Sequence, residues 1–298
     1  MIQVTSVSKA FPGVKALDNL SCTIKKGSIY GLIGSNGSGK STLLRLLSGI
    51  YKPDCGIIRI DDQGVFENTY NKARTFFLSD EPYVLPNYSI KDMARYYKIF
   101  YPNWSDERFS ELCDIFKLPV KRPIKNFSKG MQKQAAILLG MSTRPDYYFF
   151  DETFDGLDPV MRHLVKRLLM EEIAEREVTV IMTSHNLREL EDMCDHVGLL
   201  HEGHIIFERD IDDMRLSIHK IQMAHQSPPP KEAFDDIEYL HFEQRGSVTL
   251  LIVRGDESEV MERMKKFDPI ILEVIPLTLE EVFIYEMEVA GYDINQMQ

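Results

Sequence analysis

A glycine-rich segment between an apolar strand and an apolar helix constrains this chain more than any other feature. The strand is expected at residues 28–33 and the helix at residues 42–47. The segment between them reads Gly34-Ser35-Asn36-Gly37-Ser38-Gly39-Lys40-Ser41. It matches G-x-x-x-x-G-K-[ST], in which glycines let successive backbone N–H groups point at phosphates and the helix N-terminus adds its dipole. The chain is therefore predicted to be an α/β protein built around a phosphate-binding loop.

The polar residues at the end of this loop indicate what it binds. We expect Lys40 to supply a cation to the β- and γ-phosphates of ATP, the Ser41 hydroxyl to ligate Mg²⁺, and Thr42 to add a phosphate contact. A turn that merely joined a strand to a helix would not require Lys and Ser in succession after its last glycine. Residues 34–42 are therefore interpreted as an ATP-binding site.

Two carboxylates follow a second apolar strand, residues 147–150. Parallel strands deliver such groups to the sheet edge where ligands bind. We expect Asp151 to lie in the Mg²⁺ shell and Glu152 to act as general base on the attacking water. Alone, the pattern would fit a strand that ends in a solvated turn; beside a phosphate loop, the catalytic interpretation is favoured.

Length and charge limit the remaining possibilities. The chain has 298 residues, enough for a large domain and a smaller one. Its formal net charge of -11 gives no global positive field, so nucleic-acid binding is disfavoured. No apolar run reaches the roughly 20 residues of a membrane helix, and the start of the chain lacks the pattern of a secretory signal. Any membrane role is expected to require a partner.

The hydrophobic pattern suggests how the chain is organised. A strand at residues 57–60 indicates the edge of a β-subdomain, and Ser89 can cap a helix with Asp92 at its third position. A second helix is predicted at residues 105–116, and a buried parallel strand at residues 178–182. The domain boundary is placed after residue 212. Residues 213–298 then read strand, strand, helix, strand, helix, which predicts a small α+β accessory or dimerisation domain.

A polar turn that opens an apolar helix precedes the carboxylates by about twenty residues. It reads Phe127-Ser128-Lys129-Gly130-Met131-Gln132. It resembles the L-S-G-G-Q signature of ATP-binding-cassette (ABC) proteins, in the F-S-K-G-M variant of some bacterial exporter ATPases. The resemblance implies that Ser128, Lys129, Gly130 and Met131 contact the ATP of the opposite subunit. The Ser128 hydroxyl and Gly130 N–H can do so because they lie at a helix N-terminus.

The other motifs of that family occur in order over residues 1 to about 212. Phe11 resembles the aromatic residue that stacks on adenine, although a core position is a competing interpretation. His185 resembles the switch histidine that contacts the γ-phosphate and is assigned to catalysis with Glu152. The interface loop called the D-loop is matched by Asp155, Gly156, Leu157 and Asp158. The resemblance implies a P-loop NTPase core with a β-subdomain and a helical insert at about residues 83–145.

Three positions depart from the family pattern, one of them Phe154, which precedes the D-loop core. Asp80 stands where the family usually has a glutamine that joins the Mg²⁺ site to the transporter, and a carboxylate there can still ligate Mg²⁺ or its water. Lys129 replaces the first glycine of the signature and places a cation near the opposite ATP. Glu152 and His185 are present, so the site is expected to hydrolyse ATP.

Two other features are given ordinary roles. His201-Glu202-Gly203-His204 has metal-like content, but its flanking apolar stretches predict a β-hairpin rather than a zinc site. An aromatic cluster with helical spacing is interpreted as core or as a groove for a partner helix. Its members are Tyr96, Tyr97, Phe100, Tyr101 and Trp104.

The function expected from the resemblance is ATP hydrolysis that powers a separate integral membrane subunit. ATP and Mg²⁺ are the expected cofactors, a second ABC subunit the expected partner, and the cytoplasmic face of the cell membrane the expected location. The insert is similar to those of bacitracin-type and phenol-soluble-modulin exporters, which suggests export of peptide or antibiotic-like cargo. A soluble ABC ATPase that acts on a non-membrane partner such as the ribosome is the alternative. A phosphotransferase is disfavoured because it does not need Ser128-Lys129-Gly130. Cargo, direction of transport, and homodimer versus heterodimer are not encoded in these motifs.

Overall fold

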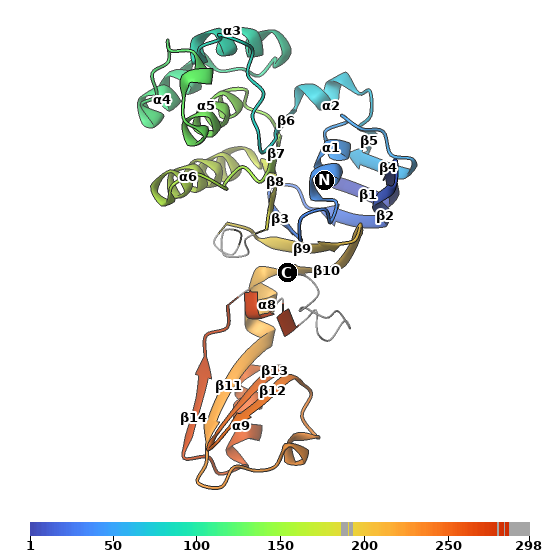
Figure 1. The fold of residues 1–298 in the computed structure, drawn as a ribbon, viewed down its shortest axis with the longest axis vertical. Coiled ribbons are helices and arrows are strands. Elements are labelled where there is room, and N and C mark those ends of the chain that lie inside the picture. The colour runs from blue at the N-terminus through green and yellow to red at the C-terminus, as the bar shows by residue number, and fades with distance from the viewer. Residues whose placement is uncertain (186–189, 191–192, 279, 283, 286–298) are drawn as a thin grey trace. The chain divides into compact units, whose positions relative to one another are not determined.

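The computed structural model describes residues 1–185, 190, 193–278, 280–282 and 284–285. The chain divides into two compact units, Met1–Glu208 and Arg209–Gln298, both drawn in Figure 1. The predicted boundary at residue 212 falls within α8 (Ile211–Ser217), the first helix of the second unit.

A six-stranded sheet forms the centre of the first unit, with strand order β10-β9-β3-β8-β7-β6. The strands are β3 (Ile29–Ile33), β6 (Thr75–Leu78), β7 (Tyr147–Asp151), β8 (Thr179–Ser184), β9 (His196–His201) and β10 (His204–Asp210). The pairs β6–β7, β7–β8, β8–β3 and β3–β9 are parallel. Every residue of β3, β7 and β8 is buried, as expected for parallel strands covered on both faces. Their carboxyl ends meet at one sheet edge.

An antiparallel sheet with strand order β2-β1-β4-β5 lies in the same unit. Its strands are β1 (Ile2–Phe11), β2 (Val14–Ile24), β4 (Cys55–Ile60) and β5 (Gln63–Gly64). It shares one hydrophobic cluster with α1 (Lys40–Leu47) and β7, including Ile2, Leu44 and Phe149. Register shifts interrupt the pairing of β1 with β2 between Val4 and Ala10, as β-bulges do.

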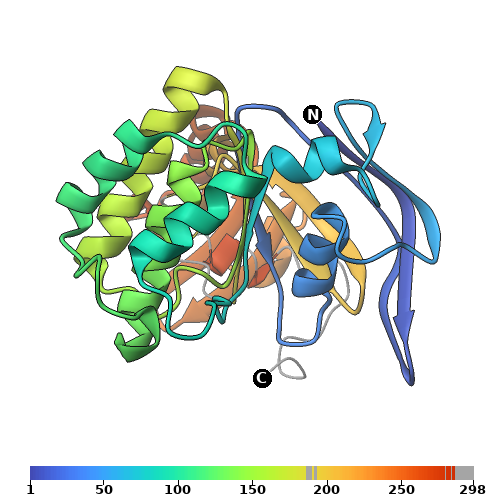
Figure 2. The ribbon, with the colours of Figure 1, turned by 90° about the horizontal axis from the view of Figure 1, so that it is seen from above.

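Helices gather on the other side of this unit, as the teal and green ribbons of Figure 2 show. They are α3 (Ile90–Phe100), α4 (Asp106–Phe116), η1 (Ile124–Asn126), α5 (Lys129–Ser142) and α6 (Pro159–Arg176). By contrast, α2 (Thr69–Ala73) lies beside β5, where the Asn71 amide donates to the Gly64 carbonyl oxygen. Ser89 and Asp92 form the predicted capping box of α3, and Ser105 caps α4. Within the described part of the chain, no helix has both the length and the apolar composition needed to span a bilayer.

The second unit contains a four-stranded antiparallel sheet with order β12-β13-β11-β14. Its elements after α8 are β11 (Ile218–Ala224), η2 (Lys231–Phe234), β12 (Tyr239–Arg245), β13 (Val248–Arg254), α9 (Glu257–Lys265) and β14 (Ile271–Ile275). Buried residues of β11, β13 and α9 form its core, including Ile221, Leu251 and Met264. The sequence analysis missed the inner strand β11. The predicted last helix, residues 279–287, lies partly outside the described residues.

Candidate functional site

The loop between β3 and α1 has a backbone that only glycine fits at two positions. Gly39, which precedes α1, has φ of 112°, and a Cβ there would lie 2.4 Å from the Ala16 carbonyl oxygen. A Cβ on Gly34 would lie 2.2 Å from the Leu200 carbonyl oxygen. The first turn of α1 contains no acidic residue, so its N-terminal N–H groups and dipole are available to an anion.

Lys40 is folded back over this loop. Its Nζ donates to the carbonyl oxygens of Gly34 at 2.7 Å and Ser35 at 3.1 Å, and lies 3.6 Å from Glu152 Oε1. The residue is only 4% exposed. A buried ammonium group beside a helix N-terminus is suited to bind phosphate oxygens, because the low dielectric around it strengthens the attraction between the ammonium and the phosphate charges.

Asp151, at the end of β7, joins three segments. Its Oδ1 accepts hydrogen bonds from Ser41 Oγ and Thr183 Oγ1, each at 2.9 Å. Thr183 Oγ1 in turn accepts from the Glu152 backbone N–H at 3.0 Å. The sequence analysis did not identify Thr183 as a site residue. Its position as a polar residue near the end of a buried parallel strand could have indicated this role.

Two of the three predicted magnesium ligands are in direct contact. Ser41 and Asp151 offer a hydroxyl and a buried carboxylate at one point, an oxygen donor set of the kind Mg²⁺ prefers. These two residues therefore fit the ion. Asp80 forms an ion pair with Lys133 Nζ at 2.8 Å, and its part in the Mg²⁺ site stays a prediction.

Glu152, Asp155 and His185 lie close together beside Lys40. His185 Nδ1 lies 3.2 Å from Asp155 Oδ2 and 3.7 Å from Glu152 Oε2. Glu152 has φ of 45°, the left-handed region that non-glycine residues seldom adopt. The structure thus brings together both predicted catalytic residues and the first residue of the predicted D-loop. A carboxylate in this position can accept a proton from water held near the phosphate loop.

Ser128 and Asp158 begin two helices of the predicted interface motifs. The Ser128 hydroxyl caps α5 by accepting from the Met131 N–H at 3.3 Å, and Asp158 caps α6 by accepting from Met161 at 2.9 Å. The first turn of α5 also lacks acidic residues. A Cβ on Gly130 would lie 3.2 Å from the Gly156 carbonyl oxygen, so the predicted signature and D-loop pack closely within one chain.

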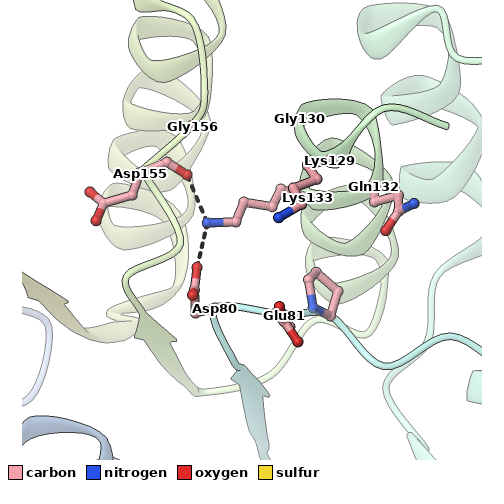
Figure 3. Close-up of a pocket in the computed structure, with 9 residues that line it drawn as sticks. Asp80, Glu81, Lys129, Gly130, Gln132, Lys133, Asp155 and Gly156 are labelled. Atoms are coloured by element: carbon pink, nitrogen blue, oxygen red, sulfur yellow. Dashed lines mark hydrogen bonds and ion pairs between the residues drawn. The ribbon is translucent and has the colours of Figure 1, made fainter.

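Lys133 connects the signature helix α5 with the D-loop. The sequence analysis did not identify this residue. Figure 3 shows its side chain reaching from α5 toward Asp80 and the Asp155 carbonyl group. A pocket of about 390 Å³ adjoins it. The pocket is lined by Asp80, Glu81, Pro82, Lys129, Gly130, Gln132, Lys133, Asp155 and Gly156.

Phe11 and the aromatic cluster of α3 are partly accessible. Phe11, 37% exposed at the end of β1, packs edge-on against Tyr51 with ring centroids 5.5 Å apart. On α3, Tyr97 packs against buried Phe76, whereas Phe100 is 55% exposed. Phe11 is therefore not a core residue, and its stacking on adenine stays a prediction.

The histidine-rich segment 201–204 forms the predicted β-hairpin. β9 ends at His201 and β10 begins at His204, with Glu202 and Gly203 at positive φ in the turn. Among the described residues, the grouping of acidic and histidine side chains close enough to share an ion is Glu152, Asp155 and His185, not this hairpin.

Comparisons with known proteins point to one family. A family model described as "ABC transporter" matches residues 17–155. The chain is 32% identical to the ABC transporter ATP-binding protein YtrB of Bacillus subtilis, over 95% of this chain and 97% of that protein. It is 30% identical to the bacitracin transport ATP-binding protein BcrA of Bacillus licheniformis, over 72% and 71% of the two chains. It is 28% identical to the lantibiotic transport ATP-binding protein SrtF of Streptococcus pyogenes, over 71% and 92%.

Solved structures share the fold of the first unit. An ATP-binding subunit of an ABC transporter superposes with a TM-score of 0.67 at 24% identity, over 72% of this chain and 92% of that one. A dimeric ATP-binding cassette bound to ADP and phosphate gives a TM-score of 0.65 at 21% identity, over 71% and 99%. The α/β core with its mostly parallel sheet is thus the fold of ABC cassettes.

Proposed function

Because the chain belongs to the family of ABC transporter ATP-binding proteins, and is thus the ATP-hydrolysing subunit of a transporter, we propose that it powers export of a peptide or antibiotic-like cargo. The observation that carries the cargo class is the similarity to BcrA and SrtF, whose names specify bacitracin and lantibiotic transport. The membrane-spanning part is a separate subunit, and this chain works on the cytoplasmic face through it.

The residues of the phosphate loop have distinct tasks in this proposal. The backbone N–H groups of residues 34–41 and the Lys40 ammonium bind the β- and γ-phosphates of ATP. Ser41 and Asp151 would hold Mg²⁺, which neutralises phosphate charge when bound. Glu152 takes a proton from the attacking water, and His185 contacts the γ-phosphate from the end of β8.

The signature helix supplies the second half of each ATP site. Ser128 and Gly130 lie at a helix N-terminus that has no acidic residue in its first turn. In a dimer of two ABC subunits, this end binds the γ-phosphate held by the other subunit. Hydrolysis removes the shared γ-phosphate, so the dimer opens and the motion passes to the membrane subunit.

An exposed apolar face on α3 supports a docking role for the helical insert. Ile99 is 75% exposed and Phe100 55% exposed at the end of α3, and the Tyr96 ring packs against Phe100 with centroids 5.0 Å apart. Large apolar side chains gathered at a surface favour contact with a partner. We assign this face to a helix of the membrane subunit.

Drug sensitivity of cells that lack this chain tests the cargo class. Cells complemented with the wild-type chain should survive higher concentrations of a bacitracin-like peptide than cells complemented with Glu152→Gln, and the membrane subunit should co-purify with both. Equal survival would reject this cargo. Cosedimentation with ribosomes in place of a membrane protein would support the soluble alternative.

A further inference from the structure

The ammonium group of Lys133 uses all three of its protons, one on Asp80 after β6 and two on the loop that follows β7. Nζ donates to Asp80 Oδ1 at 2.8 Å, to the Glu152 carbonyl oxygen at 3.0 Å and to the Asp155 carbonyl oxygen at 2.7 Å. An ammonium has three donors, so this one is saturated. The residue is 8% exposed, and a buried lysine with every proton bonded is a fixed part of its surroundings.

The bond to Glu152 acts on an unusual backbone conformation. Glu152 has φ of 45°, and such conformations persist in non-glycine residues only where the surroundings hold them. Here both sides of the residue are held: its N–H donates to Thr183 Oγ1, and its carbonyl oxygen accepts from Lys133. The backbone direction at this residue decides where its carboxylate lies, 3.6 Å from Lys40 Nζ.

One of the partners of Lys133, the Asp80 carboxylate, is largely exposed. The side chain of Asp80 is 57% exposed, against 10% for that of Lys133. An ion pair with an exposed carboxylate is weakened by water and salt. The hydrogen bonds to the two carbonyl oxygens therefore fix the position of the ammonium group more than the ion pair with Asp80 does. Asp80 is the partner that Lys133 can give up for another.

We propose that Lys133 is a positioning residue for ATP hydrolysis: from the signature helix it holds the Glu152 peptide and the Asp155 carbonyl group, and so aims the Glu152 carboxylate at the attacking water. Because Lys133 lies on α5 and is hydrogen-bonded to Glu152, a displacement of α5 would shift the general base directly, with no change in the phosphate loop. The inference rests on the catalytic assignment of Glu152 and is independent of the cargo.

Lys133→Met tests this because it keeps a long apolar side chain and removes the donors. The kcat for ATP should fall about 10- to 100-fold, since misplacing a catalytic group costs this much, while KM for ATP changes less than about threefold. Hydrogen exchange should speed up across residues 151–158 and stay unchanged across residues 34–41. Lys121→Met, at an exposed lysine outside the site, is the matched control and should keep wild-type kcat.

Further variants keep the test decisive. Lys133→Gln retains N–H donors on a shorter side chain and should give an intermediate kcat; it replaces Lys133→Met if the latter does not fold. Wild-type kcat in the folded variant, or equal losses of kcat and ATP binding, would overturn the proposal. Glu152→Gln is assayed in parallel. If this variant still hydrolyses ATP, the assignment of Glu152 as general base fails. If it is inactive while the Lys133 variant keeps wild-type activity, only the positioning role of Lys133 is rejected.

Discussion

Thr183 donates its hydroxyl proton to Asp151 Oδ1 at 2.9 Å, which links neighbouring strands β8 and β7 at the edge where they reach the phosphate loop. The hydroxyl oxygen of Thr183 also accepts from the Glu152 N–H at 3.0 Å. One buried hydroxyl therefore orients a proposed metal ligand and holds the peptide of the proposed general base.

Thr183→Val should lower both stability and turnover. It preserves the shape of the side chain but leaves the Glu152 N–H without this acceptor, at a cost of about 1–3 kcal/mol in the free energy of unfolding. Urea denaturation and ATPase assays measure the two effects. Thr183→Ser keeps the hydroxyl and should stay near wild type; equal stability of the Val and Ser variants would contradict this role.

Lys40→Ala and Glu152→Gln should fail in different ways. Lys40→Ala removes a cation from the ground-state phosphates and should weaken ATP binding. Glu152→Gln should preserve binding, stop turnover and accumulate an ATP-bound dimer, because the amide cannot take a proton from water. Nucleotide titration, ATPase assays and light scattering separate these outcomes. Near wild-type hydrolysis by Glu152→Gln would make the general-base assignment wrong.

Ser128→Arg should abolish ATPase activity while ATP binding to the isolated subunit stays almost intact. The added side chain blocks a helix N-terminus that serves the other subunit's nucleotide. Mixing Ser128→Arg with Lys40→Ala subunits gives dimers with one intact and one doubly damaged site, so activity returns in part if one site suffices. A loss of binding in Ser128→Arg monomers would place this residue in its own subunit's site.

Asp61 should contribute stability that is lost in acid. Burial alone would raise its pKa, but hydrogen bonds from the N-terminal ammonium, Arg74 and Tyr147 outweigh burial and lower the pKa from 3.8 to about 2. A lowered carboxyl pKa means that the contribution is complete above pH 3.8 and disappears as pH falls toward 2. In urea denaturation, Asp61→Asn should lose less stability than wild type between pH 5 and pH 2. Parallel pH profiles would contradict this.

A chain that ends at Asp210 should bind ATP with unchanged affinity but dimerise less well or lose coupling to the membrane subunit. The phosphate loop and the carboxylates all lie before the cut, which follows the last residue of β10. The removed unit has its own core and folds around β11 and β13. Light scattering and partner-stimulated ATPase assays test this, and the prediction fails if both match the full chain.

Local sequence patterns were enough to predict the ATP-binding core, because its functional residues lie in short motifs directly after the strands. Gly34–Ser41 predicted a loop between a strand and a helix, and β3 and α1 flank it. Parallel pairing of β3, β8 and β7 then brings Ser41, Asp151 and His185 to one edge. The family resemblance supplied the position of Ser128, which by itself reads as a plain helix cap.

Tertiary neighbours decided what the sequence could not predict. Lys133 looks like an ordinary lysine of a helix, and only its approach to Glu152 and Asp155 gives it a task. The partner of Asp80, a buried lysine from α5, could likewise not be predicted from the sequence around Asp80. β11 was missed because seven residues between a short helix and a proline-rich stretch carry a weak alternation, which becomes clear only once Ile221 and Met223 face the core.

The absence of acidic residues from the first turns of α1 and α5 has a consequence for the kinetics of ATP capture. The whole chain carries a formal charge of -11, so an anionic nucleotide approaches against long-range repulsion and is attracted by the helix ends only at close range. Salt screens distant charges more than buried ones. Added salt should therefore quicken the encounter with ATP while doing little to the lifetime of the bound nucleotide, so the association rate, not the dissociation rate, should respond to ionic strength.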